Sequence, residues 1–141
     1  MVPISELCEE HRQLEAHAER LRKIVMGRVA DPASVAAMRW QMARAIDNHC
    51  VHEDQEIYQA IFASGDGEAT RAAWAYRQEH GRIGRSFAKY VSDWPVSRKY
   101  REWDAFRAET LALLDSLAVR MAGEEASLYA HAERVRLRHA A

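Results

Sequence analysis

The chain has 141 residues, of which 48% are hydrophobic and 29% charged, and its formal net charge is −1. These values are typical of one soluble domain, residues 1–141, and the near-zero charge gives no electrostatic basis for nucleic-acid binding. No segment has the long apolar run of a membrane-spanning helix, and the N-terminus lacks the features of a signal peptide. We therefore expect a cytoplasmic protein that binds neither nucleic acid nor membrane.

Apolar residues recur with helical spacing along nearly the whole chain, and no stretch shows the period of two that predicts a strand. The pattern predicts a first helix that ends near residue 26, before a break at residues 27–32. A second helix is predicted from about Ser34 to Ser64, and a third ends at Trp94, before the fourth. The fold class is all-α, and the short links favour an up-down-up-down antiparallel four-helix bundle.

Polar residues interrupt the apolar stripe of every predicted helix. A charge buried without a partner costs several kcal/mol, so these residues need partners inside the bundle. A helix rises about 1.5 Å per residue, so most of the histidines and glutamates among them lie at a similar distance from the same end of the bundle. His49 lies one helical turn further from that end. They can converge on one point, which indicates a metal site. The residues are His11, His49, Glu53, His80, Arg120 and Glu124.

Two segments of the chain are near copies of each other. Residues 49–58 and 120–129 both fit the frame X-x-x-x-Glu-acidic-x-x-aliphatic-Tyr, where X is His49 in the first copy and Arg120 in the second. A His and a Glu four residues apart lie on one helix face and can reach the same metal ion. Arginine is permanently cationic and offers no lone pair, so the second copy lacks one ligand.

The order His, His-x-x-x-Glu, His and then x-x-x-x-Glu over four helices resembles the hemerythrin-like (HHE cation-binding) domain, from Leu7 to Tyr129. The resemblance implies one or two ions of non-haem iron and a small diatomic molecule as a further partner. It also implies a role in oxygen, nitric oxide or oxidative-stress sensing, or in iron handling. Imidazole and carboxylate ligands without thiolates also suit iron. The implied metal ligands are His11, His49, Glu53, His80 and Glu124.

The chain departs from the family pattern on two helices. Arg120 replaces a histidine, and the third helix has one histidine where true hemerythrins have two, four residues apart. Tyr76, at that spacing from His80, could bring a phenol to the site or simply belong to the core. His52 and Glu56 could supply a shifted ligand or form an exposed pair.

Three interpretations remain open at this point. In the first, the site binds iron at reduced occupancy, with one ion. In the second, Arg120 pairs with Glu124 and Glu53 in place of a metal, and the domain is a metal-free structural or interaction module. In the third, which ranks last because the sequence shows no substrate pocket, the bundle is an enzyme that acts on a small oxidant or nitric oxide. Trp40 and Trp74 lie off the core stripes and could mark a homodimer contact.

Overall fold

The computed structural model describes residues 3–140, apart from the side chains of residues 80–83, 139 and 140. Every element in this part of the chain is helical, which confirms the all-α class. None of its helices is long and apolar enough to cross a membrane. The elements are α1 (Ile4–Val25), α2 (Pro32–Glu53), the π-helix η1 (Asp54–Tyr58), α3 (Gln59–Ser64), α4 (Gly67–Asp93), α5 (Val96–Arg101), α6 (Trp103–Gly123), the π-helix η2 (Glu124–Leu128) and α7 (Tyr129–Ala140).

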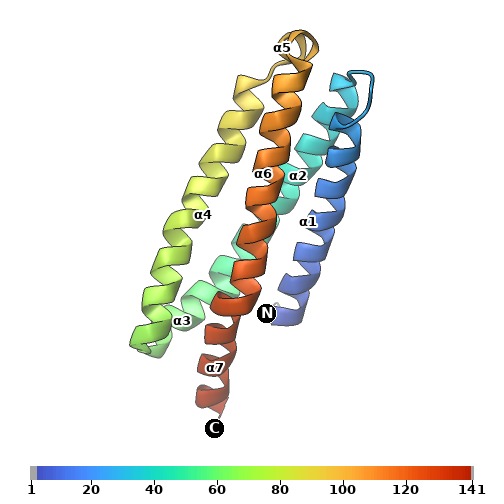
Figure 1. The fold of residues 1–141 in the computed structure, drawn as a ribbon. Helices are drawn as coiled ribbons and strands as arrows, with labels where there is room; N and C mark the ends of the chain where they lie inside the picture. Colours follow the sequence, from blue (N-terminus) through green and yellow to red (C-terminus); the bar gives the residue numbers. More distant parts are fainter. Residues whose placement is uncertain (1–2, 141) are drawn as a thin grey trace.

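Long helical rods lie side by side in the molecule (Figure 1). One rod is α2–η1–α3 and another is α6–η2–α7, because each element continues directly into the next. α1 packs against α2 and α6, while α4 packs against α3, η2 and α7. The short helix α5 contacts α2 and α6 at the end of the molecule opposite both chain termini (Figure 1).

The helix ends follow the local signals in the sequence. Asp31 caps α2, where its side chain accepts a hydrogen bond from the backbone N–H of Ser34, so this helix begins two residues earlier than predicted. Gly65 ends α3 with a φ of 75°, a conformation that side chains disfavour. Helix α5 was not predicted, because six residues are too few to show a periodic pattern.

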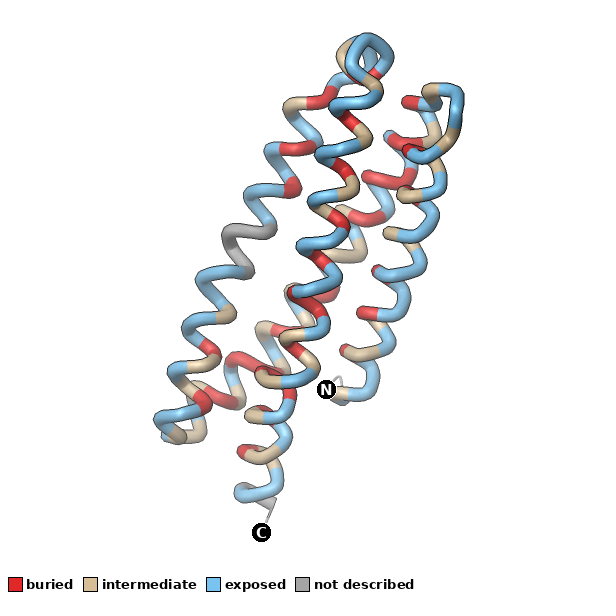
Figure 2. The backbone as a smooth tube through the Cα atoms, in the orientation of Figure 1, coloured by how far each residue is buried: buried red, intermediate tan, exposed pale blue. Residues whose placement is uncertain are grey.

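The described side chains form two apolar core clusters with a polar layer between them. On α1, His11 lies between Leu14, in the cluster toward α5, and Leu7, in the cluster toward α3 and α7. The same order holds on the α2–η1–α3 and α6–η2–α7 rods. Figure 2 shows the buried positions facing the interior of the molecule. Packing on both sides fixes the backbone that carries the polar layer.

Both copies of the repeat change from α-helix to π-helix at the polar layer. η1 begins directly after Glu53, and η2 begins at Glu124. A π-turn widens the helix by about one residue and redirects the side chains that follow, and such turns are frequent at functional sites. The sequence analysis predicted neither π-helix.

Candidate metal centre

Four buried side chains from α1, α2 and the start of η2 meet in the polar layer. One potential ligand atom of each lies within 4.8 Å of those of the other three, and the four residues are His11, His49, Glu53 and Glu124. The fold thus brings together four of the five site residues predicted from the sequence. The fifth, His80, is on α4, and its side chain lies outside the described part of the structure.

The distances between these atoms fit a single cation. His11 Nε2 lies 3.0 Å from both His49 Nε2 and Glu124 Oε1. His49 Nε2 lies 3.1 Å from Glu53 Oε2 and 4.0 Å from Glu124 Oε1. Bonds of about 2.1 Å to one ion place neighbouring ligand atoms about 3 Å apart. Imidazole nitrogens and carboxylate oxygens suit iron, manganese or zinc, so the donor set fits a divalent transition metal.

Glu10 supports this group from outside. It accepts hydrogen bonds from Nδ1 of His49 at 2.8 Å and from Nδ1 of His52 at 2.5 Å. A metal-binding histidine usually donates its second N–H to a carboxylate in this way, because the bond fixes the tautomer and the ring orientation. His52 therefore pairs with Glu10, and Glu56 forms an ion pair with Arg136 at 3.3 Å. Sequence reasoning missed Glu10, which carries no motif of its own.

Tyr129 is a further member of the site that the sequence analysis did not identify. Its hydroxyl donates a hydrogen bond of 2.7 Å to Glu53 and lies 3.2 Å from His11 Nε2 and 3.3 Å from His49 Nε2. Burial, followed by the nearby charge of Glu53, raises the pKa of Tyr129, so the phenol keeps its proton. The available signal was the tyrosine that ends both copies of the repeat.

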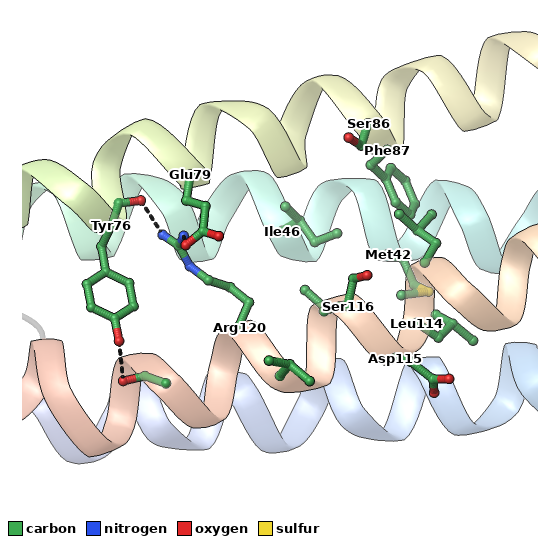
Figure 3. A pocket seen from close by; sticks show the side chains of 14 residues that line it. Met42, Ile46, Tyr76, Glu79, Ser86, Phe87, Leu114, Asp115, Ser116 and Arg120 are labelled. Atoms are coloured by element: carbon green, nitrogen blue, oxygen red, sulfur yellow. Dashed lines mark hydrogen bonds and ion pairs between the residues drawn. The ribbon is translucent and has the colours of Figure 1, made fainter.

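Arg120 binds the opposite side of Glu124. Its Nε donates to Glu124 Oε2 at 2.8 Å. Its Nη2 donates to the backbone oxygen of Tyr76 at 2.6 Å (Figure 3). A second ion pair joins Nη1 to Glu79 at 3.5 Å. Burial lowers the pKa of Arg120, but the neighbouring Glu124 carboxylate outweighs burial and raises it, so the guanidinium stays charged. The predicted pairing with Glu124 is confirmed, while the pairing with Glu53 stays a prediction.

The two oxygens of Glu124 therefore serve different partners. Oε1 contacts His11 in the polar layer, and Oε2 is held by Arg120, whose guanidinium extends toward α4. The Arg–Glu pair and the potential metal ligands coexist in one arrangement. The presence of Arg120 does not remove Glu124 from the group.

Tyr76 does not bring its phenol to this group. Its hydroxyl donates to the backbone oxygen of Gly123 at 2.9 Å (Figure 3). A Cβ atom at position 123 would lie 3.2 Å from the same hydroxyl, so glycine allows the close approach of α4 to α6. Tyr76 thus positions the helix that carries Arg120 and Glu124.

The charges of the group act strongly on its neighbours. Burial lowers the pKa of His49, but Glu53 and then Glu10 more than reverse this effect and raise the pKa to about 9. His49 is therefore protonated at neutral pH when no metal is bound, and a metal must displace that proton. Burial, followed by Glu53, raises the pKa of Cys50 to about 12, so Cys50 stays a thiol.

The fold and the site together define an all-helical protein with a buried His/Glu group that could bind a metal ion. Residues 2–132 match the family model for hemerythrin, described as the hemerythrin HHE cation-binding domain. The match covers most of the chain, so the chain belongs to this family, which confirms the resemblance. No curated protein and no solved structure matches it.

Proposed function

We propose that the protein binds one non-haem iron ion through His11, His49, Glu53 and Glu124, with His80 as the fifth ligand. The main support for this proposal is that four buried potential ligand atoms lie within 4.8 Å of one another. Iron, when bound, would supply redox chemistry and an open position for a small diatomic ligand. Glu10 would orient His49, and Tyr129 would hold Glu53 by its hydroxyl hydrogen bond.

One ion is proposed, and not two, because of Arg120. Its guanidinium holds Oε2 of Glu124, the oxygen that a bridging carboxylate would offer to a second ion. The same residue stands where the second His-x-x-x-Glu would supply its histidine, and its fixed positive charge repels a cation. The centre is therefore proposed as a mononuclear form of the family site.

The proposed role is binding and sensing of oxygen, nitric oxide or oxidative stress, or iron handling, in the cytoplasm and without catalysis. This role rests on family membership. Residues 1–141 are proposed to form one domain, an up-down-up-down four-helix bundle in which α5 belongs to the last link. A homodimer contact through Trp40 and Trp74 stays a prediction, supported by the exposure of both rings.

The alternative is a metal-free structural or interaction module. Two observations favour it: Arg120 pairs with Glu124 at 2.8 Å, and Tyr129 donates to Glu53 at 2.7 Å. Both buried carboxylates therefore have a hydrogen-bond donor when no ion is present, and such partners reduce the cost of burying their charge.

Metal analysis of protein purified without chelators from iron-supplemented cells separates the two proposals. The mononuclear centre predicts about one iron per chain, and Arg120→His should raise this toward two because it restores the missing ligand. Arg28→His, on the exposed α1–α2 loop, is the matched control and should leave the content unchanged. Wild-type protein that takes up no metal on reconstitution would support the metal-free module. Two irons per wild-type chain would refute the obstruction by Arg120.

A further inference from the structure

A second group of buried polar side chains lies at the α5 end of the molecule (Figure 1). Of the eight polar or charged residues that are buried in the described part of the chain, five belong to the polar layer around the metal group. The other three are Arg39 on α2, Lys99 on α5 and Thr110 on α6. Arg39 lies ten residues before His49 on the same helix, roughly 15 Å along its axis, so this group is separate from the metal ligands.

Aromatic rings connect the two cations of this group. The Arg39 guanidinium lies 5.2 Å from the ring centre of Tyr90 and 5.9 Å from that of Phe106. The Lys99 ammonium also lies 5.9 Å from the ring centre of Phe106. Tyr90 in turn shares a hydrogen bond of 2.7 Å with Thr110. The faces of the rings attract both cations, but they do not replace the oxygen or anion acceptors that N–H groups require.

Neither cation has a carboxylate at ion-pair distance among the described residues. Nε and Nη1 of Arg39 are buried without a hydrogen-bond partner, and Nη2 donates only to the backbone oxygen of Trp94, at 3.3 Å. Burial, followed by the charge of Arg39, lowers the pKa of Lys99 to about 8. Two neighbouring positive charges are therefore buried without an anion, which is a costly arrangement unless an anion joins them.

Acidic residues at this end of the molecule are used elsewhere. Glu109 accepts a hydrogen bond from Nε1 of Trp94 at 2.7 Å, and Glu102 pairs with Arg98 at 3.0 Å. Both glutamates are exposed on α6 or at its start, whereas the two cations are buried. The contrast with the metal layer is clear, because Glu124 lies next to the buried guanidinium of Arg120 there.

We propose that Arg39 and Lys99 together bind a small inorganic monoanion such as chloride. The anion would accept hydrogen bonds from Nε or Nη1 of Arg39 and from the ammonium group of Lys99, and it would offset the repulsion between them. It enters beside α5, the short helix that carries Lys99 and packs against α2 and α6.

Burial and charge define the ligand class. Arg39 is 6% exposed and Lys99 1%, and the neighbouring rings of Trp94 and Phe106 are buried, so a larger organic anion would have to displace packed side chains. A dianion would match the charge of the pair, but it costs far more to dehydrate, because the penalty grows with the square of the charge. A neutral molecule would leave both charges uncompensated.

Urea unfolding of the metal-free chain at pH 7 and constant ionic strength tests the proposal, with chloride replacing gluconate. The wild-type midpoint should rise with chloride, because an ion that binds only the folded chain stabilises it. Arg39→Met and Lys99→Met should each weaken chloride binding at least about tenfold, since one charged hydrogen bond is lost. At the lowest chloride concentration, Lys99→Met should unfold at higher urea than wild type, because it removes an uncompensated buried charge. Arg101→Met, exposed on the same helix, is the control and should keep the wild-type response.

Three results would overturn the proposal. A wild-type midpoint that does not change with chloride would show that the pair binds no such ion. An equal chloride response in wild type, Arg39→Met and Lys99→Met would place the ion elsewhere. Sulfate that stabilises wild type relative to Arg39→Met more than chloride does would mean that the ligand is a dianion; this comparison cancels general salt effects. Because the protein is metal-free and its metal ligands are unchanged, none of these results depends on the proposed iron site.

Discussion

The two copies of the repeat have the same length and each contains a π-helix, which begins one position earlier in the second copy, yet they contribute to the polar layer in different ways. In the first copy, His49 and Glu53 both direct side-chain atoms into the polar layer. In the second copy, Glu124 does so, while the guanidinium of Arg120 extends to the backbone of α4. The second copy instead contributes its last residue, Tyr129, which donates to Glu53 of the first copy.

This difference shows how an arginine in the place of a potential metal ligand can be accommodated in the buried layer. A histidine at position 120 would need a metal or a carboxylate to satisfy its ring. Arginine is long enough to satisfy Glu124 with Nε and the Tyr76 carbonyl with Nη2 at the same time. Each copy therefore has an ion pair between residues four apart, Arg120–Glu124 in the second and His49–Glu53 in the first. Only in the first copy do both members belong to the group of potential metal ligands.

The largest effect is expected from Arg120→Met, which breaks the ion pair of the second copy. In metal-free protein, Glu124 would keep its buried charge without Arg120, so the free energy of unfolding should fall by about 3–5 kcal/mol. Urea denaturation with a chelator present measures this loss, and Arg28→Met should cost about 0.5 kcal/mol or less. Added metal should reduce the loss, since an ion would again neutralise Glu124. A stable Arg120→Met protein that also binds no metal would contradict both roles assigned to this residue.

The stability contributed by the first copy should change with pH over a range in which the contribution of the second copy stays constant. Without metal, His49 has a folded-state pKa of about 9, above the value of about 6.5 expected in the unfolded chain. Its charge therefore contributes stability that is fully present below pH 6.5 and is lost as the pH rises through 9, by roughly 3 kcal/mol in total. Arg120 keeps its charge throughout this range. Urea denaturation between pH 6 and 10 measures the slope, which His49→Gln should remove and Arg28→Met should keep.

Glu10→Gln tests the support that His49 of the first copy receives from α1. Loss of the carboxylate next to His49 Nδ1 should weaken metal binding by about 10–100-fold, because the ring loses its orientation and part of its basicity. Anaerobic titration of ferrous iron against a chromophoric chelator measures this affinity. Glu9→Gln, one residue away and exposed, should bind iron like wild type. Unchanged affinity in Glu10→Gln would mean that His49 needs no outer partner.

Much of the site followed from helix geometry. A regular helix has a fixed rise and angle per residue, so the stripe positions of His11, His49, Glu53 and Glu124 predicted their convergence. His49 was expected one turn deeper, yet its ring reaches Glu53 because residues four apart stack on one helix face. These are backbone properties that repeat along the whole rod, which is why a sequence pattern can reveal them.

Other features depend on side-chain paths and on local turns, which a periodic pattern does not encode. The direction of Arg120 depends on the carbonyl of Tyr76, 44 residues away in the sequence. Glu10 was missed because it flanks the stripe position of His11, and its role depends on the packing of α2 against α1. The π-helices and α5 span only five or six residues each, too few to show a period of their own.

The smallest expected change in stability concerns the hydrogen bond that Tyr129 of the second copy donates to Glu53 of the first. Tyr129→Phe removes one donor to the buried carboxylate of Glu53, and a hydrogen bond to a charged group contributes about 1.5 kcal/mol or more. Tyr76→Phe is the matched control, because it removes a hydroxyl that donates to the neutral carbonyl of Gly123, and its cost should be about 0.5–1 kcal/mol. Urea denaturation of the metal-free proteins compares the two. With metal present, the difference should narrow, because an ion bound to Glu53 would replace the lost donor. Equal costs in the two metal-free variants would mean that Tyr129 packs beside Glu53 without stabilising its charge, and that the two copies do not depend on each other through this bond.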